Sequence, residues 1–413
     1  MLEKNYIPPH AALQLLLDAL ANLPLRSEKL ELDAAFRRVL AEDVVSSEDL
    51  PGFARSTVDG FAVQASFTFG AREQMPAYLT LAPEVLMGES PSFTLQHGQA
   101  APVPTGGMLP GGADAVVMLE DCQRVSDTTI EVMRAVAPAE NVVQRDEDIH
   151  RGELVLERGQ RLRPQDVGAL AGLGIESVEV YERPVVAIIS TGDEVIPLGL
   201  PVRPGQVRDI NSFTLRGLIQ QQGAIPVCRG IVRDDYEAIR RAVSEALAAS
   251  DMVLIIGGTS AGVRDMSASI IDSFGAPGVL FHGVAVKPGK PMIGGIIGKK
   301  PILGLPGHPA AMAISHALFI RPLIDLLHGA YRKVCFPRTV SALMAKAVSS
   351  AAGREDHIRV RLEMCDEVHY AVPVLGKSGL ISTLVRADGT VTIAAPKLGL
   401  DADEPVSVNL FEA

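Results

Sequence analysis

The most constraining feature of this sequence is a stretch, between about residues 181 and 328, in which apolar strands alternate with amphipathic helices. Residues 236–249 repeat apolar side chains at helical spacing, and residues 252–256 are apolar throughout. Strands without polar alternation are typical of parallel sheets that are covered by helices on both faces. The stretch therefore predicts a doubly wound α/β domain, with further elements at residues 184–190, 212–222 and near Ile225.

The rest of the chain has a different pattern. From about residue 45 to 150 it holds short apolar runs broken by glycine and proline, which predict a small β domain. Residues 10–22 favour a helix, because their leucines fall on one face. After about residue 329 short alternating runs predict a separate C-terminal β domain. A length of 413 residues is enough for about three domains of ordinary size.

Charge and composition argue against several classes of protein. A net charge of −11 disfavours a nucleic-acid-binding protein, which needs a basic face to neutralise phosphate. The N-terminus lacks a signal sequence, and no run approaches the roughly 18 apolar residues of a membrane span. The four widely spaced cysteines form no metal or disulfide pattern and are expected to be reduced, buried thiols. We therefore expect a cytoplasmic protein without nucleic-acid or membrane partners.

Polar loops follow the predicted strands, at the edge where ligands bind in an open parallel sheet. Residues 190–194 carry a hydroxyl and two carboxylates, Asp193 and Glu194. Residues 257–262 are rich in glycine, so their backbone amides can turn toward a phosphate, although a tight strand-to-helix connection explains the same glycines. Asp265 follows in the next helix. Carboxylates without a histidine or cysteine cluster favour magnesium over zinc.

Two Pro-Gly turns lie close together, at residues 287–291 and 305–309. The first holds Lys287 and Lys290 on a backbone stiffened by two prolines. Rigid cationic turns of this kind suit a phosphate or another oxyanion, whereas solvated surface lysines are the alternative. We expect the first turn to follow a strand at residues 283–286, so that lysines and carboxylates together can hold a divalent cation and the anion it bridges.

Other polar residues have both a structural and a functional interpretation. Asp234 and Asp235 precede the helix of residues 236–249 and are explained by N-capping. Asp59 lies beside a glycine in a polar turn, and glycines also follow Thr105. These segments are either ordinary surface turns or places where the backbone approaches a ligand closely.

In their order and spacing, these segments resemble the molybdopterin molybdenumtransferase family, which includes the MoeA proteins and the gephyrin E domain. The resemblance runs through nearly the whole chain, at residues 56–60, 104–106, 109–120, 147–152, 190–194, 209–212, 234, 257–265, 287–291 and 305–309. It implies a discontinuous elongated domain at residues 26–45 and 146–180, an inserted β domain at 46–145, a molybdopterin-binding α/β domain at 1–25 and 181–328, and a C-terminal β barrel at 329–413.

The resemblance also implies a reaction. Adenylylated molybdopterin, the product of an upstream molybdopterin adenylyltransferase, receives molybdate and releases AMP with the help of Mg²⁺. The family is homodimeric, and each active site joins the α/β domain of one subunit to the inserted domain of the other. On this basis Asp59 and Thr105 are expected to reach the partner's pocket.

Roles for individual residues follow from the matching positions. The resemblance implies catalytic roles for Asp59, Lys287, Lys290 and Glu194, and metal binding by Asp193, Glu194 and Asp265. Arg359 and Ser378 match positions that the family uses around the oxyanion. The full set of residues expected to bind the pterin substrate, its phosphates or the oxyanion is Thr105, Gly257, Gly258, Thr259, Ser260, Asp234, Pro306, Pro309, Arg359 and Ser378.

The chain departs from the family pattern at the oxyanion end. His308 stands where many relatives have Asn, Ala311 where a hydroxyl residue is common, and Gly283 where some relatives carry a further lysine. Two other functions fit the same framework: a scaffold without the chemistry, and an adenylyltransferase that uses the α/β domain. The retained acidic and lysine loops argue against the scaffold, and the full set of flanking domains argues against the adenylyltransferase.

Overall fold

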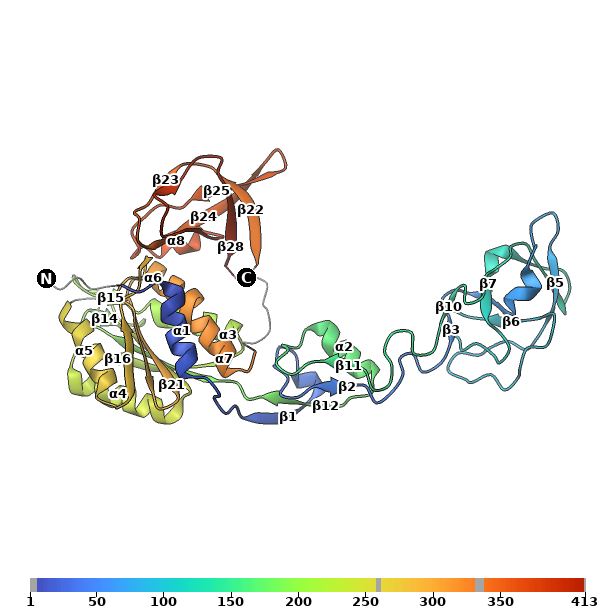
Figure 1. Cartoon of the computed structure of the whole chain (residues 1–413), viewed down its shortest axis with the longest axis horizontal. Coiled ribbons are helices and arrows are strands. Elements are labelled where there is room, and N and C mark those ends of the chain that lie inside the picture. Colours follow the sequence, from blue (N-terminus) through green and yellow to red (C-terminus); the bar gives the residue numbers. More distant parts are fainter. Residues whose placement is uncertain (1–5, 258–260, 331–337, 412–413) are drawn as a thin grey trace.

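The computed structural model describes residues 6–257, 261–330 and 338–411, without the side chains of residues 261–265. The chain is elongated (Figure 1). An α/β domain and a C-terminal barrel lie together at one end, a small β domain lies at the other, and a slender segment of short strands joins them. The predicted multidomain fold class is therefore confirmed.

The α/β domain is built on a six-stranded sheet that is mostly parallel. The strand order is β16 (Ile225–Val232), β13 (Val185–Thr191), β17 (Met252–Ile256), β21 (Lys300–Leu305), β20 (Ile293–Ile297) and β18 (Pro277–His282). The strands from β16 to β21 run parallel, as predicted. β20 runs antiparallel to both of its neighbours, so the sheet is mixed at that edge.

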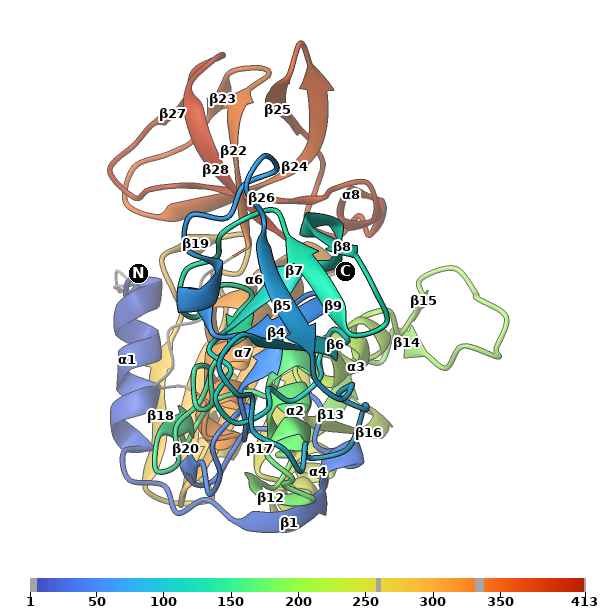
Figure 2. The same cartoon turned by 90° about the vertical axis from the view of Figure 1, so that its right-hand side faces the viewer.

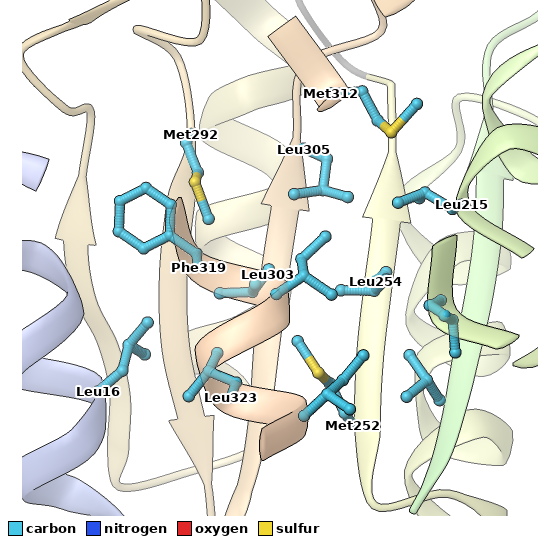
Figure 3. Packing of buried hydrophobic residues seen from close by; sticks show 14 of the residues in the cluster. Leu16, Leu215, Met252, Leu254, Met292, Leu303, Leu305, Met312, Phe319 and Leu323 are labelled. Carbon is cyan, nitrogen blue, oxygen red and sulfur yellow. The ribbon is translucent and has the colours of Figure 1, made fainter. Parts of the chain in front are cut away.

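Helices cover both faces of this sheet. Successive residues of a strand point to opposite faces, so each strand contributes apolar side chains to two cores. Val186 and Ile188 of β13 pack into one core, while Ala187 and Ile189 pack into the other. Figure 3 shows the first core, which Leu16 of the N-terminal helix joins. The first face is covered by α1 (Pro9–Ala19), α3 (Asn211–Gln221), α6 (Pro309–Ser315), the π-helical η4 (His316–Ile320) and α7 (Arg321–Leu327), and the second by α4 (Tyr236–Ala249) and α5 (Ala261–Asp272).

One helical stretch corrects an expectation from the sequence. Pro309–Leu327, which spans α6, η4 and α7, is long and apolar enough to cross a membrane by length and composition, with a mean hydropathy of 1.5. Within the fold, 61% of this apolar window is buried, and Met312, Phe319 and Leu323 pack into the first core. Packing against the sheet therefore explains its apolar character.

The C-terminal strands close into a barrel, as predicted. β24 (Glu355–Cys365) pairs with both β25 (Val368–Pro373) and β26 (Gly389–Ile393), while β22 (Thr339–Met344) and β28 (Pro405–Leu410) complete the ring. The short elements around the barrel are β23 (Val348–Ser349), paired with β27 (Gly399–Leu400), and α8 (Ser382–Val385).

The prediction of a strand at residues 283–286 is wrong. The strand in this region is β19 (Val286–Lys287), and it pairs in parallel with β24 of the barrel rather than with the α/β sheet. The first lysine turn thus lies at the junction of the two domains. Figure 2 shows the barrel above the α/β domain, with β19 at the level of their junction.

Short strand pairs connect the α/β domain to the inserted domain. The slender segment consists of β1 (Ser27–Glu31) paired with β12 (Ser177–Tyr181), β2 (Val44–Val45) paired with β11 (Leu154–Leu156), η1 (Leu32–Ala34) and α2 (Pro164–Gly172). The pair β3 (Arg55–Ser56) and β10 (Val142–Val143) leads into the inserted domain. Its sheet has the order β7 (Ala115–Met118), β4 (Gly60–Val63), β6 (Gln99–Val103), β5 (Ala77–Leu81), β9 (Thr129–Val132) and β8 (Cys122–Arg124), with η2 (Ala65–Thr68) and η3 (Leu119–Asp121) beside it.

The cysteines are less buried than the sequence suggested. Cys228 and Cys365 are exposed and Cys122 is half-buried, while Cys335 lies outside the described residues. Burial, and then the nearby carboxylate of Asp121, raise the pKa of the Cys122 thiol to about 12. This thiol is therefore a weak nucleophile at neutral pH.

Candidate active site

Three loops of the α/β domain meet at the carboxyl edge of its sheet. β13, β17 and β21 are neighbours, with Ser190 opposite Ile256 and Ile256 opposite Leu305. The amide of Gly257, directly after β17, donates to the carbonyl of Leu305 at 3.2 Å. The acidic loop (residues 190–194), the glycine loop that begins at Gly257 and the second Pro-Gly turn (residues 305–309) therefore begin side by side, as expected for a ligand-binding sheet edge.

Three carboxylates from two loops lie close together: Asp193 and Glu194 follow β13, and Asp234 follows β16. The amide of Asp234 lies 3.4 Å from Oδ1 of Asp193. Burial, followed by the charges of Glu194 and Asp193, raises the pKa of Asp234, while a hydrogen bond from Thr191 opposes this shift. Oδ1 of Asp234 is buried without a hydrogen-bond partner among the described residues. Positive charge at this place would relieve the mutual repulsion of the carboxylates.

Helix capping accounts for the neighbouring aspartate rather than for Asp234. The side chain of Asp235 accepts a hydrogen bond from the Ala238 amide at 2.9 Å and so caps α4. Asp209 similarly accepts from the Ser212 amide at 3.1 Å, at the start of α3. The capping interpretation is thus confirmed for Asp235 and is wrong for Asp234, whose carboxylate lies beside those of Asp193 and Glu194.

Replacing Asp234 by asparagine is expected to stabilise the metal-free protein at neutral pH. Because folding raises the pKa of this carboxyl, its ionised form is penalised in the folded state. Wild type therefore gains stability relative to the variant as the pH falls through the raised pKa. Differential scanning fluorimetry in EDTA should show that the difference in melting temperature between Asp234→Asn and wild type becomes smaller as the pH is lowered. Asp235→Asn, which retains the cap, serves as control, and a difference that widens toward acidic pH would contradict this account.

Two parts of the predicted metal and phosphate site are not described. The side chain of Asp265 and residues 258–260 lie outside the described residues. Where side chains are described, no group of three His, Cys, Asp or Glu has the spacing of a metal site. Gly257 is described and has a φ of 120°, and a Cβ there would lie 2.4 Å from the carbonyl oxygen of Thr191. Only glycine permits this close approach of the two strand ends.

Lys287 is tied to the barrel through a buried carboxylate. Its Nζ lies 3.2 Å from Oδ2 of Asp356, whose side chain is 0% exposed. Asp356 also accepts hydrogen bonds from the Ser350 hydroxyl at 2.8 Å and from Nε of Arg354 at 3.0 Å. No sequence pattern indicated Asp356 or Arg354, because their proximity to Lys287 depends on the pairing of β19 with β24.

A cavity of about 470 Å³ lies between the two Pro-Gly turns, and both the turns and the barrel line it. A neighbouring cavity of about 400 Å³ shares Lys287, Pro288 and Ser378 with it and is also lined by Arg359 and Lys377. The structure thus brings together the lysine, proline, arginine and serine positions that the sequence had singled out. The first cavity is lined by Val286, Lys287, Pro288, Gly289, Lys290, Pro291, Pro306, His308, Ala311, Arg354 and Ser378.

The second Pro-Gly turn is bonded to the barrel. Nδ1 of His308 lies 2.9 Å from the hydroxyl of Ser378, and the Ala310 amide donates to the Ser378 carbonyl at 3.1 Å. Pro309 is buried as the first residue of α6 and does not line either cavity. His308 therefore orders Ser378 beside the cavity, whereas the position of Pro309 is explained by the start of the helix.

Arg359 is a buried cation at the edge of the second cavity. Its side chain donates from Nη2 to the carbonyl of Gly376 at 2.9 Å. Nε has no hydrogen-bond partner among the described residues, and burial lowers the pKa of the guanidinium. A buried guanidinium with an unused donor is stabilised by an anion, which agrees with the role expected for this residue.

Asp59 and Thr105 come together in the inserted domain. Thr105 donates to Oδ1 of Asp59 from its amide at 2.7 Å and from its hydroxyl at 2.9 Å. These hydrogen bonds hold the pKa of Asp59 below its usual value, so the side chain is ionised at neutral pH. The inserted domain lies at the end of the molecule opposite to the α/β domain (Figure 1). Within one chain, Asp59 is therefore remote from the lysine turns.

Three family models match successive parts of the chain. Residues 7–174 match the MoeA N-terminal region (domain I and II), residues 187–326 a probable molybdopterin binding domain, and residues 341–411 the MoeA C-terminal region (domain IV). A putative molybdopterin biosynthesis protein of Methanocaldococcus jannaschii is 36% identical over 421 aligned residues, which cover 99% of each chain. The chain belongs to the MoeA family.

Other comparisons agree with membership of the MoeA family. A molybdopterin molybdenumtransferase of Nostoc sp. is 34% identical over 90% of this chain and 85% of that protein. The crystal structure of a molybdopterin biosynthesis MoeA protein from Pyrococcus horikoshii OT3 matches with a TM-score of 0.85 and 33% identity, and the match covers 98% of this chain and 100% of that one. The family expected from the sequence is confirmed, and the chain is a MoeA-type enzyme of molybdenum cofactor biosynthesis.

Proposed function

We propose that this MoeA chain inserts molybdate into adenylylated molybdopterin and releases AMP, with Mg²⁺, at a site shared by two subunits of a homodimer. The observation that carries the proposal is the cationic cavity of about 470 Å³ between the two Pro-Gly turns. Its cations suit molybdate, a tetrahedral dianion, and the neighbouring sheet edge suits the phosphates of the pterin substrate. The substrate would come from a molybdopterin adenylyltransferase that acts upstream, and the reaction would take place in the cytoplasm.

The proposed reaction has two parts. In one, both sulfurs of the substrate dithiol bond to molybdenum, and one molybdate oxygen leaves as water with the two thiol protons. In the other, water cleaves the phosphoanhydride bond, so that one phosphate leaves as AMP and the pterin keeps its own terminal phosphate. Lys290 and Arg359 hold negative oxygens near the cavities, so the protein contributes mainly positioning and charge stabilisation.

We assign the metal to the carboxylates that follow β13 and β16. Asp193, Glu194 and Asp234 supply the oxygen donors that Mg²⁺ prefers, and the buried, unpartnered oxygen of Asp234 supports this assignment. Asp265 joins this set on the basis of the family resemblance. When bound, Mg²⁺ would neutralise charge on the diphosphate of the substrate.

The homodimer accounts for the position of Asp59. Its carboxylate is ionised and is fixed by Thr105, yet the inserted domain lies far from the α/β domain of the same chain. A second copy that lies alongside can bring its own inserted domain to the cavity. This arrangement would add Asp59 and Thr105 of one subunit to the lysine turns of the other.

Reconstitution with defined substrates tests the proposed reaction. The protein is incubated with adenylylated molybdopterin and molybdate, and AMP and the metallated pterin are measured by chromatography, with and without EDTA. Release of AMP that requires both molybdate and Mg²⁺ is expected. A parallel incubation with molybdopterin and ATP, without molybdate, should yield no adenylylated product. Formation of that product would instead assign adenylyltransferase chemistry, and inactivity in both incubations would indicate a scaffold.

A further inference from the structure

The start of the chain lies against the base of the first lysine turn. Ile7 forms a parallel bridge with Val284, and its carbonyl accepts from the Ala285 amide at 2.8 Å. The base of the turn is closed by a hydrogen bond of 3.0 Å from the Val284 amide to the Lys290 carbonyl. Because Tyr6 directly precedes Ile7, these contacts fix its backbone beside the turn.

The ring of Tyr6 lies beneath the ammonium group of Lys290. Nζ of Lys290 is 4.0 Å from the ring centroid, which is well within the range of a cation–π contact. Gly283 makes this position possible: it has a φ of 95°, and a Cβ there would lie 2.6 Å from two ring carbons of Tyr6. The absence of a side chain at position 283 therefore leaves the space that the tyrosine ring occupies.

The two lysines of the turn are held in chemically different ways. Lys287 faces the buried carboxylate of Asp356, which offsets its charge. Lys290, by contrast, has no carboxylate within 4.0 Å among the described residues. An aromatic face attracts an ammonium group without carrying a net charge of its own, so Lys290 is restrained and its positive charge is retained.

We propose that Tyr6 is a positioning residue of the oxyanion pocket, which orders the ammonium group of Lys290 without neutralising it. The inference rests on the proposed function, in which Lys290 binds molybdate. A lysine side chain loses considerable rotamer freedom when it is fixed by an anion. Because the ring has already restricted that freedom, less is lost when the oxyanion binds, and affinity rises.

Tyrosine variants test this role through the molybdate dependence of AMP release. Tyr6→Leu should raise the KM for molybdate by about three- to tenfold, while kcat and the KM for adenylylated molybdopterin stay within about twofold. Tyr6→Phe keeps the ring and should remain close to wild type. Tyr78→Leu is the matched control, because Tyr78 is 62% exposed on β5 of the inserted domain. A general structural defect would instead lower kcat, raise both KM values and lower the melting temperature.

A double-mutant cycle separates failure of this inference from failure of the proposed function. If Lys290→Gln weakens molybdate binding and Tyr6→Leu adds nothing in that background, the ring acts through Lys290 and the inference stands. If Lys290→Gln weakens binding but Tyr6→Leu alone matches wild type, the inference is overturned and the proposed site survives. If Lys290→Gln leaves molybdate binding unchanged, the proposed site itself fails.

Discussion

Replacing Lys290 by glutamine is expected to lower kcat/KM for molybdate by about 10²- to 10³-fold, the range found when one charge-stabilising donor is removed from an active site. Lys290 lines the cavity between the Pro-Gly turns and is held by an aromatic ring rather than by a carboxylate. No carboxylate among the described residues offsets its charge, which is therefore available to an anion in the cavity. Lys287 keeps its contact with Asp356 in the variant, so the junction with the barrel should persist.

Steady-state measurement of AMP release against molybdate concentration checks this prediction. Lys299→Gln is a suitable control, because Lys299 is an exposed residue in the hairpin between β20 and β21. The control should stay within about twofold of wild type, as surface substitutions usually do. A Lys290 variant with normal kcat/KM and an unchanged melting temperature would exclude Lys290 from the oxyanion site.

Asp59→Asn is expected to reduce insertion by at least about 10²-fold while leaving the fold intact. The asparagine carbonyl can still accept both hydrogen bonds from Thr105, so the turn should keep its shape, but the negative charge is lost. Because Thr105 holds the pKa of Asp59 low, the wild-type residue is charged throughout the neutral range. The variant therefore isolates the contribution of that charge.

The measurements for Asp59→Asn are kcat/KM, the melting temperature and the molar mass by light scattering. Asp127→Asn provides a control in the same domain, because within the described parts of the chain the Asp127 side chain has no hydrogen-bond partner, and its backbone carbonyl accepts from Arg124. We expect both variants to melt like wild type and only Asp59→Asn to lose activity. Full activity of Asp59→Asn would show that the charge of Asp59 is not needed for the reaction, and the proposed role of the inserted domain in the active site would fail.

Much of the α/β domain was predictable because its local pattern and its tertiary environment agree. The helix at residues 236–249 and the strand at 252–256 match α4 and β17 at both ends. The helix has a clear helical period, and the apolar run of the strand is too short for a helix, so each pattern predicts the observed element. The position of Asp193 and Glu194 directly after a strand of the sheet was also predicted correctly.

The parts that were missed depend on contacts between distant segments. Residues 283–286 look like a sheet strand, but β19 pairs with β24, which lies about 70 residues later in the chain. Asp356 and Tyr6 reach the lysine turn only through such pairings, so no local pattern reveals them. Asp234 was ambiguous for a different reason, since either of two adjacent aspartates can cap the same helix, and the structure shows that Asp235 does so.

The most direct test of the shared active site is complementation between two inactive variants. Asp59→Asn and Lys290→Gln subunits are unfolded and refolded together, and AMP release is compared with that of each variant alone. If each site uses Asp59 of one subunit and Lys290 of the other, random pairing makes half of the dimers mixed, and each mixed dimer has one intact site. We therefore predict recovery of about a quarter of wild-type activity. If mixed dimers form and remain inactive, both residues belong to a site within one chain, and the account is contradicted.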